Sequence, residues 1–379
     1  MKIIHFCLSS FYIDNQLYQE NELVRQHVEA GHEVLVIAST EVFDDKGNVS
    51  YCQSCEYTGA DGAKVIRLPY SFWLPHFIAS RLRIYPGVYK LLEGFSPDVI
   101  MFHGASAWEL NTVANYVGCN PHVIFNIDSH ADAVNSAHGP LSLEVLHKRF
   151  YAPILRNAMR FSGPLLCVSK TVMQFAENIY CVPRERIEFF PLGGRIIEEQ
   201  VRRSLRLSFR KKMNISDNEV LIVQSGKQNK LKKLTSSLRA FAQVDNPNLK
   251  FMIVGILQDD IRSECERLIA EDLRVEFIGW QDASALTEIL CAADVYLQPG
   301  TQSATMQHSL CCGCAVVLDN IEAHLPYVSG NGWLVSTEND LKNTFMEVAQ
   351  ADLEKYKAVS LELASNMLDY VKLAERILV

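Results

Sequence analysis

The chain has 379 residues, 48% apolar and 21% charged, which fits a folded protein of two domains and excludes a disordered chain or a small disulfide-stapled module. Its 36 Lys and Arg residues against 44 Asp and Glu residues give a formal charge of −8, which argues against binding nucleic acid through bulk charge. The sequence has no run of roughly 18 apolar residues and opens without a signal peptide, and several of its 11 cysteines lie inside apolar runs, so we expect a cytoplasmic protein.

Short apolar strands alternate with longer amphipathic helices through the first half of the chain. We predict strands over residues 3–8, 34–38, 99–102, 123–125 and 165–168, and helices over residues 17–30, 108–117, 141–160 and 171–179. Because the strands are continuous apolar runs, they are expected to form a parallel sheet with helices on both faces.

The same alternation restarts after a basic stretch at residues 202–212. Predicted strands cover 220–224, 251–254, 275–278, 295–298 and 315–318, and predicted helices cover 234–244, 261–270, 283–292 and 305–312. The sequence therefore predicts an α/β protein of two doubly wound domains, residues 1–195 and 196–352, with a final helix over 353–379 that packs back on the first domain. Since such sheets bind ligands at the carboxyl ends of their strands, we expect the active site in a cleft between the domains.

A basic turn follows the first predicted strand of the second half, where residues 226–233 read Gly-Lys-Gln-Asn-Lys-Leu-Lys-Lys. A helix N-terminus attracts phosphate through its unpaired N–H groups, and lysines there supply charge to neutralise a diphosphate. A solvated basic turn without a ligand would also fit. No Gly-Lys-Ser/Thr closes this turn and no Gly-x-Gly-x-x-Gly follows either first strand, so P-loop and dinucleotide roles are disfavoured.

A second polar segment, residues 298–308, again joins a predicted strand to a predicted helix. Ser303 and Thr305, with backbone N–H groups at the helix start, are suited to contact the same phosphates. Ser303 alone is equally well explained as a helix N-cap.

An ordered set of short motifs resembles the retaining glycosyltransferases of the GT-B fold. In the first half these are Ala-Gly-His-Glu-Val at 30–34, Pro-Asp-Val-Ile at 97–100, Val-Ser-Lys at 168–170 and Pro-Leu-Gly-Gly at 191–194. In the second half they are the basic turn, Phe-Ile-Gly-Trp at 277–280, residues 292–299 and Cys-Gly-Cys-Ala-Val-Val at 312–317. The resemblance covers nearly the whole chain.

The resemblance implies transfer of a sugar from a nucleotide diphosphate sugar with retention of configuration. By position, Lys227 and Lys232 would stabilise the departing diphosphate, and His130 would approach the sugar. The donor-binding positions implied are Gly226, Gly255, Trp280, Gln281, Gln302, Ser303, Thr305, Gln307 and His308.

The chain departs from the family's pattern where two glutamates are usual. No acid lies between Pro299 and Gly313, and Gln302, Gln307 and His308 stand near the missing positions. Glutamine still hydrogen-bonds hydroxyl groups, but without assistance from a charge. The family implies no bound metal or other cofactor. A metal site at Asp128, His130 and Asp132 is a second interpretation of that segment, because alternate strand positions share a face.

Residues 70–90 mix aromatic and basic side chains, which suits contact with a lipid surface at the inner face of a membrane, although a core-facing helix explains them as well. The predicted partners are a nucleotide-sugar donor and a glycan or lipid-linked acceptor, with no nucleic acid and with a role in surface polysaccharide biosynthesis. Two competing functions remain open: a nucleotide-sugar epimerase on the same fold, and a non-catalytic scaffold subunit.

Overall fold

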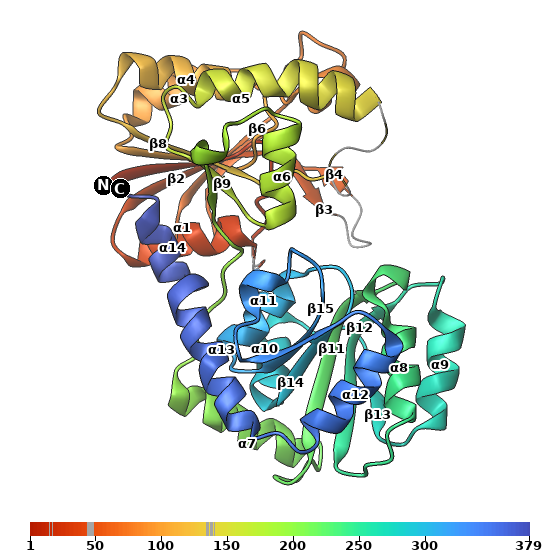
Figure 1. Cartoon of the computed structure of the whole chain (residues 1–379). Coiled ribbons are helices and arrows are strands. Elements are labelled where there is room, and N and C mark those ends of the chain that lie inside the picture. The colour runs from red at the N-terminus through yellow and green to blue at the C-terminus, as the bar shows by residue number, and fades with distance from the viewer. Residues whose placement is uncertain (15, 17, 44–48, 134–135, 137–138, 140) are drawn as a thin grey trace. The chain divides into compact units, whose positions relative to one another are not determined.

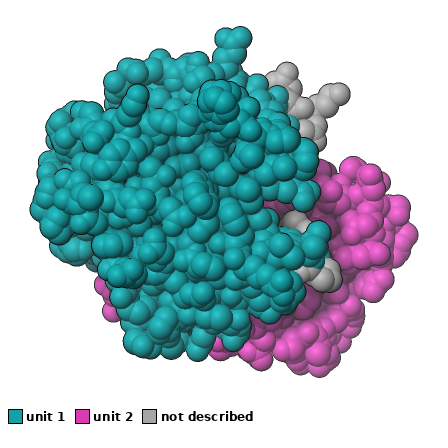
Figure 2. All heavy atoms as spheres, turned by 90° about the horizontal axis from the view of Figure 1, so that it is seen from above, with its two compact units in different colours: residues 1–192, 370–379 teal, residues 193–369 magenta. Residues whose placement is uncertain are grey.

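The computed structural model describes residues 1–14, 16, 18–43, 49–133, 136, 139 and 141–379 (Figure 1). The chain divides into two compact units, residues 1–192 with 370–379 (unit 1) and residues 193–369 (unit 2), coloured separately in Figure 2. Each unit contains one main sheet that is covered by helices, and the doubly wound α/β architecture expected from the sequence is confirmed.

Unit 1 is built on an eight-stranded sheet of order β10-β9-β8-β7-β1-β2-β6-β5. All its pairings are parallel except that between β5 and β6. The strands are β1 (Lys2–Cys7), β2 (Glu33–Ser39), β5 (Cys55–Thr58), β6 (Lys64–Leu68), β7 (Val99–Phe102), β8 (Ile124–Ser129), β9 (Leu165–Cys167) and β10 (Ile187–Phe189), and β3 (Glu41–Phe43) and β4 (Val49–Tyr51) form a separate hairpin.

Helices cover both faces of this sheet. Figure 1 shows α3, α4 and α5 over one face, and α1 and α14 over the other. The helical segments are α1 (Gln19–Glu29), α2 (His76–Leu82), α3 (Val88–Phe95), α4 (Glu109–Cys119), the π-helix η1 (Ser142–Tyr151), α5 (Ala152–Ala158), α6 (Lys170–Asn178), the 3₁₀ turn η2 (Arg184–Arg186) and α14 (Tyr370–Arg376).

The alternation of β1 divides its side chains between the two faces. Ile4 and Phe6 join the core beneath α3 to α5, whereas Ile3 packs with residues of α14 on the opposite face. His5 therefore points to the face covered by α1 and α14, where it is fully buried. This placement puts a titratable ring inside the core of unit 1.

Unit 2 is built on a six-stranded, wholly parallel sheet of order β13-β12-β11-β14-β15-β16. Its strands are β11 (Val220–Gln228), β12 (Leu249–Leu257), β13 (Val275–Phe277), β14 (Val295–Gln298), β15 (Ala315–Asp319) and β16 (Gly332–Val335). Its helical segments are α7 (Glu199–Lys212), η3 (Lys230–Lys232), α8 (Leu234–Ala242), α9 (Arg262–Glu271), α10 (Ala283–Ala292), α11 (Ala304–Cys311), η4 (Leu325–Tyr327), α12 (Glu338–Val348) and α13 (Leu353–Met367).

Three predicted boundaries differ in the structure. The final helix is broken at Leu368, whose carbonyl accepts a hydrogen bond from the N–H of Gly194, so α13 belongs to unit 2 and only residues 370–379 belong to unit 1. The predicted strand 220–224 continues to Gln228, because β12 continues beside it to Leu257. The helix predicted over 17–30 begins at Gln19, and residue 17 lies outside the described residues.

Candidate active site

In unit 1, the loops that follow three neighbouring strands meet at the carboxyl edge of the sheet. Ser9 follows β1, Gly104 follows β7 and His130 follows β8. The loops are tightly packed: Ser9 Oγ donates to the carbonyl of Ser106 at 3.1 Å, and a Cβ on Gly104, whose φ is +91°, would come within 2.6 Å of Ser9 Oγ.

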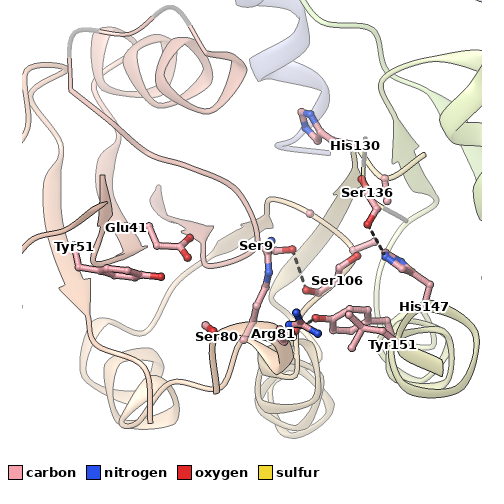
Figure 3. Close-up of a pocket in the computed structure, with 15 residues that line it drawn as sticks. Ser9, Glu41, Tyr51, Ser80, Arg81, Ser106, His130, Ser136, His147 and Tyr151 are labelled. Atoms are coloured by element: carbon pink, nitrogen blue, oxygen red, sulfur yellow. Dashed lines mark hydrogen bonds between the residues drawn. The ribbon is translucent and has the colours of Figure 1, made fainter. Parts of the chain in front are cut away.

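These loops border a cavity of about 390 Å³ (Figure 3). Its lining is mostly polar and comes entirely from unit 1: Ser9, Glu41, Tyr51, Ser80, Arg81, Arg83, Gly104, Ala105, Ser106, His130, Ala131, Ser136, Leu146, His147 and Tyr151. The volume lies in the range of about 300 to 1,000 Å³ that is usual for small-molecule sites.

His130 stands at the edge of this cavity with 34% of its side chain exposed, and its Nε2 lies 3.6 Å from Oδ1 of the buried Asp128. Burial opposes protonation of the ring, but the Asp128 carboxylate outweighs it and raises the pKa of His130 to about 9. His130 is therefore a charged imidazolium at neutral pH, suited to donate to an oxygen atom or to stabilise negative charge rather than to accept a proton.

Asp128 is the last but one residue of β8 and is completely buried. Its Oδ1 accepts from the N–H of Gly104 and its Oδ2 from Nδ1 of His103, both at 2.7 Å. Burial alone would raise the pKa of Asp128, but the charges of His103 and His130 keep this pKa well below its ordinary value. Asp128 is thus a carboxylate held between two histidines.

A chain of buried histidines continues inward from Asp128. His103 Nε2 lies 2.9 Å from His5 Nδ1, His5 Nε2 lies 2.9 Å from His27 Nδ1, and His27 Nε2 lies 3.0 Å from the carbonyl oxygen of Ala374. None of the three rings is more than 1% exposed. The chain joins β1, β7, α1, α14 and, through Asp128, β8.

Counting protons along this histidine chain fixes its charge. The Ala374 carbonyl accepts only, so His27 donates from Nε2, His5 donates to His27, and His103 donates to His5. His103 must also donate to the Asp128 carboxylate. The chain from the Ala374 carbonyl to Asp128 contains four hydrogen bonds, and each of them needs one proton. Three neutral imidazole rings carry only three N–H protons. One ring is therefore charged.

The two inner rings of the chain, His5 and His27, are neutral. Burial, with the neighbouring His27 and His103, keeps the pKa of His5 well below its ordinary value, and burial lowers the pKa of His27 to about 4. Both rings are thus neutral at pH 7. Asp128 thus has His103 as its partner inside the fold and His130 as its partner at the cavity.

In unit 2, the predicted phosphate-binding lysines lie at the carboxyl end of β11. Contrary to the predicted loop, Gly226 and Lys227 remain in the strand, paired with Gly255 and Ile256 of β12. A Cβ on Gly255, at φ +131°, would come within 2.0 Å of the Gly226 carbonyl oxygen. Only glycine therefore fits at 255, where it keeps the two strands close, and the side chain of Lys227 is exposed.

Lys232 ends the 3₁₀ turn that follows this strand. Its Nζ donates to the carbonyls of Thr301 at 2.7 Å and Gln302 at 3.2 Å, which ties the loop after β11 to the loop after β14. Burial lowers the pKa of Lys232 to about 8. No carboxylate of a described residue pairs with this ammonium, so its charge is available to an anionic ligand.

Gln302 and Gln307 converge on one phenol. Gln302 Nε2 lies 3.3 Å and Gln307 Nε2 lies 3.2 Å from the hydroxyl oxygen of Tyr327. Within the described part of the chain, the buried Gln307 Oε1 has no hydrogen-bond partner. These amides lie where the family's glutamates are usual. Tyr327, which no sequence motif singles out, contacts both of them.

Ser303 occupies the N-cap position of α11 but does not cap it. Its hydroxyl donates to Oε1 of Gln298 at 3.0 Å instead of accepting from the helix. The N-cap interpretation is therefore wrong for the side chain. Thr305 lies in the first turn of the same helix and is half-buried.

The turn after β13 lies beside Gly255, whose N–H donates to the Gly279 carbonyl at 2.8 Å. Trp280 is 62% exposed, and Gln281 Nε2 donates to the Ile278 carbonyl at 2.9 Å. The turn after β13 thus lies at the same edge of the sheet as Gly226 and Gly255.

His308 is the predicted donor residue that the structure places elsewhere. Its Nε2 lies 2.9 Å from Thr287 Oγ1 of α10, and burial lowers its pKa to about 4. Successive residues of a helix point about 100° apart. Gln307 therefore points toward Tyr327 and Gln302, whereas its neighbour His308 points toward α10.

The segment from Asp128 to Asp132 does not have the strand geometry on which a metal site there would depend. Asp128 lies within β8, whereas His130 and Asp132 lie beyond its end, so the three side chains do not alternate along one strand. Among the described residues, no group of three His, Cys, Asp or Glu side chains is arranged to hold a metal ion. Cys311 and Cys312 are buried, as expected for core thiols.

The histidine chain has only a faint signal in the sequence, and it was not predicted. The signal is a histidine within or directly after an apolar strand, at His5 and His103. Such a residue is buried by its neighbours and needs a partner, but the sequence does not show that β1, β7 and β8 are adjacent.

Two family models match the chain. Residues 20–193 match the glycosyl transferase 4-like domain, and residues 218–351 match the glycosyl transferases group 1 model. Together the two matches cover well over half of the 379 residues. A comparison with curated protein sequences gives no match.

Solved structures share the whole fold at low sequence identity. HepE from Anabaena, in complex with UDP, has a TM-score of 0.67 and 17% identity over 100% of this chain and 98% of its own. A glycosyltransferase from Rickettsia africae has a TM-score of 0.70 and 12% identity over 99% and 96%. WaaG, a glycosyltransferase involved in lipopolysaccharide biosynthesis, has a TM-score of 0.63 and 16% identity over 99% and 98%.

Proposed function

Because the chain belongs to the group 1 glycosyltransferases of the GT-B fold, we propose that it transfers a sugar from a nucleotide diphosphate sugar to a glycan or lipid-linked acceptor with retention of configuration. The observation that carries this proposal is Lys232, an ammonium without a carboxylate partner among the described residues, fixed by two carbonyls at the carboxyl edge of the unit 2 sheet. Such a charge is what a diphosphate leaving group requires.

Unit 2 would hold the donor. Lys227 and Lys232 would contact the diphosphate, Trp280 and Gln281 would border the base, and the amide pair Gln302 and Gln307 would hydrogen-bond donor hydroxyls. A uridine donor is supported by the solved complexes of HepE with UDP and with UDP-glucose. His308 is left out of this set because it faces Thr287.

The reaction would proceed by front-face substitution. The bond from the sugar's anomeric carbon to the diphosphate oxygen breaks, the acceptor oxygen bonds to the same carbon from the same side, and the acceptor's proton passes to the departing phosphate. The lysines stabilise the phosphate charge, so the step needs no bound metal and no protein nucleophile. The His130 imidazolium would donate to an oxygen of the sugar.

The binding of UDP and GDP, measured by calorimetry, tests this proposal. We expect Lys232→Gln to weaken binding at least about tenfold, because a hydrogen bond to a charged group contributes about 1.5 to 3 kcal/mol. Since burial lowers the pKa of Lys232 to about 8, its charge is lost as the pH rises through 8 and the affinity should fall there. Lys232→Arg, which stays charged, should keep the affinity at pH 9.

The same titrations separate transfer from the two competing functions. Lys211→Gln is the control, since it changes an exposed lysine at the end of α7 and should leave binding unchanged. A chain that binds neither nucleotide is a scaffold subunit, and one that converts the donor sugar without any acceptor is an epimerase. Either result removes the proposed transfer.

A role in surface polysaccharide biosynthesis, with a lipid-linked acceptor, is supported by the likeness to WaaG and by an exposed aromatic patch of Phe72, Trp73 and Phe77. These side chains are 74%, 81% and 67% exposed, and the rings of Phe72 and Trp73 lie 4.7 Å apart. None of the described helices is long and apolar enough to cross a membrane. We therefore propose peripheral contact through this patch.

Vesicle sedimentation measures that contact. The triple variant Phe72→Ser, Trp73→Ser, Phe77→Ser should lose binding to anionic vesicles at low salt, because the patch supplies the apolar area that enters the headgroup region. The matched control is Leu207→Ser, which removes a side chain 65% exposed on α7. Equal binding of the wild type and the triple variant would contradict peripheral contact.

A further inference from the structure

The cavity of unit 1 is positively charged in a chain whose formal charge is −8. Among the described residues, Arg81, Arg83 and the His130 imidazolium line it, against one carboxylate, Glu41. The Asp128 carboxylate beneath His130 is fully buried, is hydrogen-bonded to His103 and Gly104, and is not part of the cavity lining.

Neither Arg81 nor Arg83 has an anionic partner among the described residues. No ion pair or side-chain hydrogen bond of Arg81 or Arg83 occurs within the part of the chain that the structure describes, although most other arginines of unit 1 are engaged in this way. A guanidinium that lines a cavity unpaired is a fork of donors matched to a carboxylate or a phosphate.

The backbone holds these arginines in place. Arg83 ends α2 at φ +54°, and this left-handed turn lets residues 81 and 83 line one cavity, although residues two apart on a regular helix point to different sides. The turn is tied down on both flanks: the Tyr151 hydroxyl donates to the Arg81 carbonyl, and the N–H of Trp108 donates to the Leu82 carbonyl at 3.1 Å. The backbone that carries the two arginines is therefore held in place before a ligand arrives.

The rest of the lining suits a sugar rather than a bare ion. Ser9 and Ser106 supply hydroxyl groups, and Tyr51 supplies a half-exposed aromatic ring (Figure 3). Burial lowers the pKa of His147, so this ring is neutral and adds no charge. The cavity thus combines hydrogen-bonding groups for hydroxyls with two unpaired cations.

We propose that this cavity binds the acceptor, and that the acceptor is a sugar bearing an anionic group, a carboxylate or a phosphate, which Arg81 and Arg83 hold while His130 stands at the cavity's edge. This proposal rests on the proposed sugar transfer, because only a transferase has an acceptor. Donor phosphates are assigned to the lysines of unit 2, so the two units bind different anions.

Calorimetry with three hexoses tests the charge requirement: glucose as the neutral probe, glucuronate as the carboxylate and glucose 6-phosphate as the phosphate. Each is titrated in saturating UDP, so that the nucleotide site does not compete for the phosphate. We expect at least one anionic hexose to bind about tenfold or more tightly than glucose, and the tighter of the two identifies the group.

Arg81→Gln and Arg83→Gln should each remove most of this preference, and Arg149→Gln, which changes an exposed arginine outside the lining, should keep it. Arg83→Lys should fold and retain part of the preference, which separates loss of charge from loss of structure. The proposal is overturned if neither anionic hexose binds better than glucose, or if both glutamine variants keep the preference.

The same experiment distinguishes failure of the transfer proposal from failure of the acceptor proposal. If UDP does not bind but the arginine-dependent preference persists in its absence, the cavity is an anionic-sugar site in a protein that is not a transferase. If UDP binds and the preference is absent, the transfer proposal stands and the acceptor is neutral.

Discussion

Replacing His130 by alanine is expected to slow sugar transfer about 10²- to 10³-fold and to leave the fold intact, because a preorganised donor aimed at developing charge is lost. The ring is partly exposed at the cavity edge and lies beyond the end of β8, so its removal leaves the sheet undisturbed. Initial rates at saturating donor, with thermal unfolding of the same variant, measure the two effects.

The pH dependence identifies the charged form of His130. Because the Asp128 carboxylate raises the pKa of His130 to about 9, the wild-type rate at saturating donor should fall as the pH rises through 9. In Asp128→Asn the carboxylate is gone while burial remains, so the fall should move to a pH at or below the ordinary histidine value of about 6.5.

His122→Ala serves as the control for this comparison. This histidine is exposed and lies outside the cavity, and its loss should change neither the rate nor the profile. A His130→Ala enzyme with wild-type turnover would remove His130 from the active site, and an unshifted profile in Asp128→Asn would show that the carboxylate does not set its charge.

The alternation of apolar strands and amphipathic helices was enough to predict both sheets, because strands buried on two faces leave a signal that needs no tertiary information. Six strands were missed: β3, β4 and β5 are short and mostly exposed, and β6, β10 and β16 are three to five residues long and only partly buried, so all six carry little apolar pattern.

The surroundings of the site residues could not be predicted from the sequence, because they come from elements that are distant along the chain. His130 and Lys232 follow strands, Lys227 lies at the end of one, and all three could be named from the sequence, but what surrounds them comes from other elements. The charge of His130 depends on Asp128, and Asp128 depends on His103, His5 and His27, three histidines spread over residues 5 to 103 that only the strand order brings together.

The second large effect is expected for stability, at His103. His103→Phe removes the donor to Asp128 at 2.7 Å and the donor to His5 at 2.9 Å, and leaves the buried carboxylate with only the more distant His130 as a charged partner. Breaking a buried ion pair in this way costs about 3 to 5 kcal/mol, a large part of a total free energy of unfolding of about 5 to 15 kcal/mol.

Urea unfolding of unit 1 measures this cost, and a double variant shows where it comes from. If the charge left on Asp128 is the cause, His103→Phe combined with Asp128→Leu should recover much of the lost stability, because replacing both partners of a buried pair by apolar groups is far less costly than removing one. Additive losses in the double variant would instead mean that packing, not charge, is responsible.

The pH dependence of stability supplies a second test of the histidine chain. Burial lowers the pKa of His27 to about 4, whereas the pKa of a histidine in the unfolded chain is about 6.5. The contribution of neutral His27 to the free energy of unfolding is therefore complete above about pH 6.5 and is lost as the pH falls from 6.5 through 4. The raised pKa of His130 acts in the opposite direction: its contribution is complete below 6.5 and is lost as the pH rises through about 9. Unit 1 should therefore be most stable near pH 6.5, and the alkaline loss should disappear in His130→Ala while the acid loss remains.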